Sequence, residues 1–92
     1  MRGLKPRYSD AVEVTSATGQ KILDAPIGSN PFTYLYVVNK DQDNDCELMF
    51  GDEEKFYIPK GFIGGLPGLV CNAEIKAKKL NGNVDSLYVT AW

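Results

Sequence analysis

The residues most suggestive of chemistry are the acidic side chains of the run Asp41-Gln42-Asp43-Asn44-Asp45. Carboxylates at alternate positions match the opening of a calcium-binding EF-hand loop, in which clustered oxygen atoms hold the ion. The match then fails, because Cys46 stands where the loop needs a glycine and Asp52 stands where it needs a bidentate glutamate. We therefore expect no metal and no cofactor, and interpret the run as a solvated loop whose Asp and Asn side chains cap their own backbone.

The residues needed for covalent or acid–base catalysis are scarce. The chain contains no histidine, which removes the most common general base and metal ligand. Its two cysteines, Cys46 and Cys71, fall on the inward faces of expected strands, with no neighbouring base to lower a thiol pKa. The serines have no histidine partner. We therefore expect a protein that is not an enzyme, with no catalytic residues and two free, buried thiols.

Two features suggest phosphate binding, and each has a simpler explanation. The glycine-rich stretch Gly61–Gly68 is not followed by the Lys-Ser/Thr pair of a phosphate-binding loop. Lys76 and Lys78 alternate with apolar residues, so they form the solvent face of an expected strand. A net charge of -2 and a pI near 5.0 also argue against a nucleic-acid partner.

Aromatic side chains give the clearest indication of a binding surface. The segment 32–38 has no polar face, because Leu35 and Val37 share one side and the other side carries Phe32, Tyr34, Tyr36 and Val38. The segment 84–92 repeats this pattern: Leu87, Val89 and Ala91 share one side, and the other side carries Tyr88, Thr90 and Trp92.

In a two-sheet domain only one face of each sheet reaches the core, so the second apolar face must be covered by a loop, a ligand or another subunit. Tyrosine and tryptophan are also enriched at protein interfaces. We therefore expect Tyr34, Tyr36, Tyr88 and Trp92 to contact a second copy or a partner protein. Stacking of sugar rings on the same residues is the alternative.

Short strands are the elements expected to position these side chains. No helix-length window repeats apolar residues at intervals of three and four, and glycines and prolines break the chain into strand-sized segments. The expected strands cover residues 11–16, 20–25, 32–39, 46–50, 55–58, 71–78 and 84–92. Thr18-Gly19 and Asn81-Gly82 are expected to close hairpins, the latter with a type I′ turn, and residues 62–69 to form an irregular crossing.

Strands without a crossover helix predict an all-β fold, a single antiparallel β-sandwich or small jelly roll. The length of 92 residues suits one domain, and 43% hydrophobic and 24% charged residues are typical of a globular chain. No run approaches the roughly 18 apolar residues of a membrane span, so we expect a soluble protein with no membrane partner.

The N-terminal residues 1–9 are expected to form a short arm ahead of the β-sandwich domain, which spans residues 10–92. The arm carries three basic residues, Arg2, Lys5 and Arg7, and no acidic one. Such an arm would contact an acidic groove on a neighbouring subunit and would order only on binding. A frayed terminus without a role is the alternative.

Three stretches of the sequence carry a resemblance: the basic N-terminus Met1–Ser9, the module Lys55-Phe-Tyr-Ile-Pro-Lys-Gly61, and the ending Asn81-Gly-Asn…Leu87-Tyr-Val-Thr-Ala-Trp92. Together they resemble the small β-sandwich virion proteins of tailed bacteriophages, notably capsid decoration or cement proteins. The resemblance implies a jelly-roll-like homodimer or homotrimer that clamps neighbouring capsid subunits.

The resemblance also implies partners and a location. The partners are a second copy of the chain and the major capsid protein or another virion protein, and the location is the virion, after synthesis in the host cytoplasm. A small glycan-binding or receptor-binding β-sandwich is the alternative function. An enzyme is the third class considered, and the absence of histidine argues against it.

Overall fold

The computed structural model describes residues 5–28, 30–51 and 54–92, and all regular structure within these ranges is β-strand. The strands are β1 (Tyr8–Val14), β2 (Gln20–Leu23), β3 (Phe32–Asn39), β4 (Cys46–Phe50), β5 (Glu54–Ile58), β6 (Ile63–Cys71), β7 (Ile75–Lys79) and β8 (Val84–Ala91). In the described part of the chain there is no helix of the length and apolarity required to cross a membrane.

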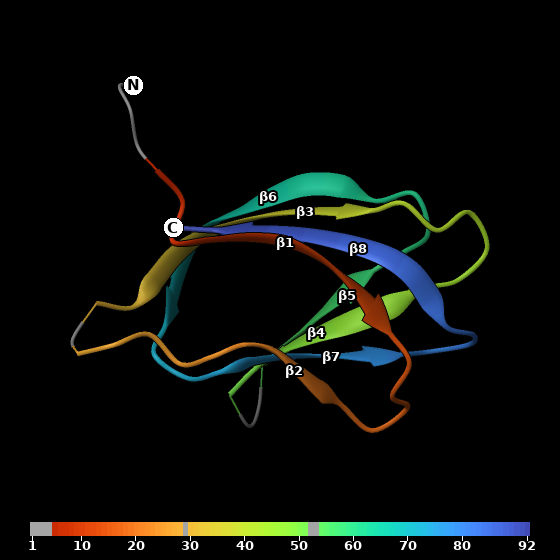
Figure 1. Ribbon diagram of the computed structural model, residues 1–92, viewed down its shortest axis with the longest axis horizontal. Coiled ribbons are helices and arrows are strands. Elements are labelled where there is room, and N and C mark those ends of the chain that lie inside the picture. The colour runs from red at the N-terminus through yellow and green to blue at the C-terminus, as the bar shows by residue number, and fades with distance from the viewer. Residues whose placement is uncertain (1–4, 29, 52–53) are drawn as a thin grey trace.

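The strands form two antiparallel four-stranded sheets that pack face to face (Figure 1). The order is β1-β8-β3-β6 in the first sheet and β2-β7-β4-β5 in the second sheet. The pairs β1·β8, β2·β7, β3·β6 and β4·β5 are nested, as if one long hairpin had been rolled up. This nesting is a jelly-roll arrangement, so the prediction of an antiparallel β-sandwich or small jelly roll is confirmed.

The core lies between the two sheets and follows the alternation of the strands. Leu35, Val37, Leu87 and Val89 of the first sheet point inward and are buried. They pack in one cluster with residues of the second sheet, among them Cys46, Leu48, Ile58, Ile75 and Ala77. Fully burying each large aliphatic side chain contributes about 1.5–3 kcal/mol, so this cluster supplies most of the drive to fold.

The expected hairpins at Thr18-Gly19 and Asn81-Gly82 are wrong, because the strands flanking each turn belong to different sheets. Each turn is an arch from one sheet to the other. Neither Asn81 nor Gly82 has a positive φ, so a type I′ turn does not form. Asn81 instead accepts hydrogen bonds through its side-chain oxygen, from the backbone N–H of Asp45 at 2.9 Å and of Gly82 at 3.0 Å.

The expected irregular crossing at residues 62–69 is also wrong, because most of it belongs to β6. The strand pairs with β3 from Ile63, opposite Val38, to Cys71, opposite Phe32. Glycine disfavours strands, but pairing with β3 satisfies the backbone groups on one side and outweighs that local preference. Cys71 therefore ends one strand instead of beginning the next, and the described residues form eight strands where seven are expected.

The side chain of Phe32 points to the opposite face of the sheet from the one expected. The side chain is buried in the core, whereas the alternation of the sequence places it outward with Tyr34. The pairing of β3 with β6 shifts register between Phe32 and Tyr34, which marks a β-bulge or similar irregularity. Such an extra residue reverses the direction of the side chains that follow it.

The arm was expected to end after residue 9, but the strands of the domain begin earlier, at Tyr8. β1 begins at Tyr8, which pairs with Ala91, and Ser9 pairs with Thr90. The backbone N–H of Arg7 donates to the carbonyl of Ala91 at 2.8 Å. Residues 7–9 have free backbone donors and an open edge of β8 beside them, so they join the sheet.

Candidate functional site

The outer face of the first sheet gathers aromatic side chains from two neighbouring strands. Tyr34 and Tyr36 belong to β3, Tyr88 belongs to β8, and Trp92 directly follows β8. The two strands pair side by side, with Val38 opposite Tyr88. The four aromatic residues therefore lie on one face, outside the sandwich, and we name them the aromatic face.

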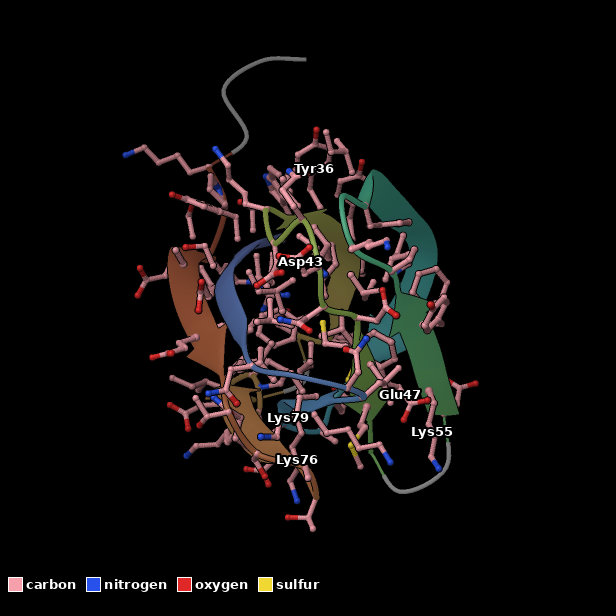
Figure 2. All side chains as sticks on the ribbon, turned by 90° about the vertical axis from the view of Figure 1, so that its right-hand side faces the viewer. Tyr36, Asp43, Glu47, Lys55, Lys76 and Lys79 are labelled. Atoms are coloured by element: carbon pink, nitrogen blue, oxygen red, sulfur yellow. The ribbon has the colours of Figure 1, made fainter. Side chains whose placement is uncertain are left out.

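Two rings of the aromatic face are open to solvent, and the other two pack on each other. Tyr36 is 39% exposed and Tyr88 is 45% exposed. The rings of Tyr34 and Trp92 are half-buried, with centroids 5.3 Å apart and planes tilted by 58°. Figure 2 shows Tyr36 and Lys76 at opposite extremes of the molecule, on the outer sides of the two sheets. Because the rings are held by paired strands, little entropy would be lost on binding.

Gly65 of β6 makes room for one of these rings. It lies opposite Tyr36, and a Cβ atom built on it would overlap the hydroxyl of Tyr34. The Tyr34 side chain therefore lies across the backbone of β6, which only glycine permits at this position. This role of Gly65 was not expected, and its only signal in the sequence is the glycine-rich stretch, for which an irregular crossing was predicted.

A shallow groove of about 390 Å³ crosses the aromatic face between its two exposed tyrosines. It is lined by Tyr36, Val38, Lys40, Tyr88 and Thr90. The Lys40 ammonium lies 5.8 Å from the centroid of the Tyr88 ring, within range of a cation–π contact. It adds a positive charge and a hydrogen-bond donor to an otherwise apolar surface.

Comparison of the chain with protein-family models, with curated proteins and with solved structures finds no match. A jelly roll by itself serves many unrelated functions, so the function has to be argued from the surface chemistry.

The outer face of the second sheet is polar, in contrast to the aromatic face. Lys21 of β2 lies directly opposite Lys76 of β7, and Lys78 lies opposite Glu47 of β4. The Lys78 ammonium is 3.7 Å from the Glu47 carboxylate, and the Lys21 ammonium is 2.6 Å from Asp24. The prediction that Lys76 and Lys78 form a solvent face is confirmed, since both are only partly buried and alternate with the buried Ile75 and Ala77.

The basic residues of the expected arm are not placed alike. The guanidinium of Arg7 donates to the carbonyls of Asn30 at 2.7 Å and Pro31 at 2.6 Å, and stands 4.7 Å from the centroid of the Phe32 ring. Arg7 therefore fastens β1 to the loop between β2 and β3 and is not part of a free arm, and its expected contact with a capsid stays a prediction. Lys5 is exposed ahead of β1, and Arg2 lies outside the described residues.

The acidic loop is organised by its own backbone, as the sequence predicts. Oδ1 of Asp41 accepts hydrogen bonds from the N–H groups of Asp43 at 2.8 Å and Asn44 at 2.9 Å, and Oδ2 accepts from Asp85 at 3.2 Å. Chiefly through the Asp43 and Asp85 bonds, the pKa of Asp41 lies below the usual 3.8. Within the described ranges no three His, Cys, Asp or Glu side chains converge as metal ligands would.

Acid should weaken this loop. Since the pKa of Asp41 is lower in the folded chain than in the unfolded one, its carboxylate contributes stability above the unfolded value, and that contribution is lost as pH falls through the folded value. We expect Asp41→Asn to unfold at a lower urea concentration than the wild type at about pH 7. At about pH 2 the unfolding midpoints of the two proteins should lie close together. Urea denaturation at both pH values measures this, and a pH-independent difference would contradict it.

Both cysteines are buried and free, as expected from their inward positions. Burial raises the pKa of the Cys46 thiol to about 12, and the neighbouring Asp45 charge adds to this effect. The thiol of Cys71 donates to the carbonyl of Ala73 at 3.4 Å. At neutral pH Cys46 is therefore protonated and is a small apolar side chain of the core, with little nucleophilic reactivity.

Proposed function

We propose that this protein is a non-catalytic structural protein of a virion, a decoration or cement protein that binds capsid subunits through its aromatic face. The observation that carries the proposal is the clustering of Tyr34, Tyr36, Tyr88 and Trp92 on the outside of the first sheet. Folding does not require them there, because the inner face of the same sheet already supplies the core.

An aromatic surface of this kind suits a protein partner. Tyrosine and tryptophan bury large areas and carry polar groups at their edges, and they dominate the energetics of protein interfaces. Among the residues that the structure describes, the outer face of the second sheet carries no comparable aromatic cluster, since Lys21, Lys76 and Lys78 dominate it. The proposed contact is therefore one-sided, which suits a protein that covers a lattice and leaves its other face in water.

The fold and the resemblance support a virion role by analogy. Jelly rolls occur in viral capsid domains and in lectins, so the fold admits both a decoration protein and a glycan-binding module. The proposed partners are a major capsid protein, or another virion protein, and a second copy of the chain. The proposed location is the virion.

Glycan binding is the second candidate, and the groove between Tyr36 and Tyr88 favours it. Sugar rings stack on tyrosine, while Lys40 and Thr90 would provide hydrogen bonds to hydroxyl groups. The two candidates differ in the size of the required partner, because a sugar fills only the groove, whereas a capsid subunit would also cover the rings of Tyr34 and Trp92.

The substitution Tyr88→Glu should separate the folded protein from its partner. A charge placed on the aromatic face would be buried without a partner on binding, and we expect the bound fraction on capsids to fall at least about ten-fold. Co-sedimentation with a panel of tailed-bacteriophage capsids lacking their decoration protein measures this. Binding to a glycan array, with no capsid co-sedimentation, would support the second candidate instead.

Tyr57→Glu provides the matched control. Tyr57 is an exposed tyrosine of β5 on the outer face of the second sheet, where it lies opposite Glu47. The same change of residue there should leave capsid binding intact. If both variants bind as the wild type does, the aromatic face is not the docking surface.

A further inference from the structure

We propose that Asn81 is a site of spontaneous covalent modification in the folded chain: the backbone nitrogen of Gly82 displaces its side-chain amide, and water opens the resulting ring to aspartate or isoaspartate. The site lies in the arch between β7 and β8 and is not part of the aromatic face. It therefore stands independently of the proposed function.

The dipeptide Asn81-Gly82 meets the chemical requirements for this reaction. It is the only Asn-Gly pair in the sequence. Asparagine is a labile residue, because the nitrogen of the next residue in the chain can attack its side-chain carbonyl carbon. Glycine at that next position has no Cβ atom to hinder closure of the ring. Asn81 is also exposed, so hydroxide and water can reach it.

The reaction balances without a cofactor. Hydroxide removes the proton of the Gly82 N–H, and the nitrogen forms a bond to Cγ of Asn81. The bond between Cγ and Nδ2 breaks, and Nδ2 takes a proton from water and leaves as ammonia. One water molecule then adds to either carbonyl carbon of the succinimide ring, which gives aspartate or isoaspartate. No atom is oxidised or reduced, and base accelerates the first step.

The fold holds the two reacting groups beside each other. The N–H of Gly82 donates to Oδ1 of Asn81 at 3.0 Å, so Cγ, which is bonded to that oxygen, also lies close to the nitrogen. A rotation of the side-chain amide is enough to turn this contact into an attack. Asn44 fixes the other side of Gly82, where a Cβ atom would stand 2.6 Å from the Asn44 Oδ1. Much of the entropy of bringing the two groups together is therefore lost on folding and not in the reaction.

The backbone of Asp45 adds electrostatic support. Its N–H donates to the same Oδ1 of Asn81 at 2.9 Å, and its carbonyl accepts the N–H of Leu80 at 3.1 Å, which fixes the donor in place. Negative charge develops on Oδ1 during the attack, and a fixed donor stabilises that charge as an oxyanion hole does. The leaving group, Nδ2, makes no hydrogen bond to any residue that the structure describes, so no such bond opposes its departure.

The two products should differ in their effect on the arch. Aspartate keeps an oxygen in the place of Oδ1 and can still accept both N–H groups. Isoaspartate adds a methylene group to the backbone, and its carboxylate hangs from the former Cα, so the acceptor is displaced. The bond to the Asp45 N–H, which fastens the arch to the residue before β4, is then lost. We therefore expect only isoaspartate to loosen the arch.

Ala73→Gly supplies a matched control inside the same chain, because it creates a second Asn-Gly dipeptide at Asn72. Asn72 is exposed between β6 and β7, and its side chain has no hydrogen bond within the described residues. The folded variant is incubated at mildly alkaline pH, and conversion at each site is measured by mass spectrometry of its peptides. We expect Asn81 to convert at least about three-fold faster than Asn72, and the two rates to become similar in urea.

The wild type gives a second test, which does not depend on the folding of the variant. Asn81 should convert faster in the folded protein than in urea. The isoaspartate form, once separated by chromatography, should unfold at a lower urea concentration than the unconverted protein, and the aspartate form should not. The proposal is overturned if Asn81 converts no faster than Asn72 in the folded variant, or no faster in the folded wild type than in urea. Equal unfolding midpoints of the isoaspartate and unconverted forms would contradict the loosening of the arch.

Discussion

Asn39→Asp should destabilise the fold by roughly 3–5 kcal/mol at neutral pH, although it changes only one side-chain group. Asn39 ends β3 and is almost completely buried. Its Nδ2 donates to the carbonyls of Asn44 and Pro59, both at 3.2 Å, and its Oδ1 accepts the N–H of Asp41 at 2.9 Å. A carboxylate would replace the donor by an oxygen that faces two carbonyls, without water to solvate its charge.

The effect of the introduced carboxyl on stability should change with pH in the opposite direction to the effect of Asp41 in the wild type. Burial raises the pKa of the introduced carboxyl in the folded chain above its unfolded value of about 3.9, so the cost shrinks as the pH falls toward that value. Asp41 of the wild type has a lowered pKa and loses its contribution in acid. Urea unfolding should show that the free energies of unfolding of the wild type and of Asn39→Asp differ less at about pH 4.5 than at about pH 7.

Asn81→Asp is the control, since Asn81 is exposed and uses only its oxygen, toward the N–H groups of Asp45 and Gly82. A carboxylate keeps both bonds, so we expect a change below about 1 kcal/mol at neutral pH. If the two variants lose similar amounts of stability, the donor bonds of Asn39 are not what ties β3 to the turns around Asn44 and Pro59.

Leu35→Ala should cost about 3 kcal/mol and lower the melting temperature by roughly 10–20 °C. Leu35 is fully buried between the sheets, and truncation leaves a cavity in the cluster that also contains Leu48 and Leu87. Tyr36→Ala, at the next position of β3, should cost less than about 1 kcal/mol because Tyr36 points outward.

In binding to capsids, Tyr36→Ala should have the larger effect and Leu35→Ala the smaller one, which reverses their order in stability. Tyr36→Ala should reduce co-sedimentation with capsids several-fold, whereas Leu35→Ala, measured well below its melting temperature, should bind as the wild type does. Thermal unfolding and co-sedimentation on one preparation measure both effects. Equal losses of stability at the two positions would show that the faces of β3 are wrongly assigned.

Much of the fold could be predicted from local patterns. The strand limits 32–39 and 46–50 agree with β3 and β4, because β-branched and aromatic residues dominate the first segment, and Cys46, Leu48 and Phe50 alternate along the second. The inward position of Cys46 follows from the same alternation, whereas Cys71 is buried at the end of β6 and not at the start of the strand expected for it. The capping role of Asp41 also follows from sequence, since aspartate bonds the backbone only two or three residues away.

The candidate site could be predicted only in part. Alternation identifies Tyr36 and Tyr88 as residues of a second apolar face, but whether two strands lie side by side depends on pairing between segments some fifty residues apart. Lys40 and Gly65 were missed for this reason. Each acquires its role from a residue on another strand, Tyr88 and Tyr34 respectively.

What the sequence by itself determined is the all-β class and the direction of most side chains, because a strand's alternation with period two is a property of neighbouring residues. Only the tertiary structure decided that the turn at Asn81-Gly82 is an arch, that β6 is a strand, and that Phe32 and Arg7 belong to the body of the domain. Those outcomes depend on which strands meet. In this nested jelly roll every strand except β5 pairs with one distant in sequence, and the free energy of that pairing outweighs the local preferences of glycine and of turn residues.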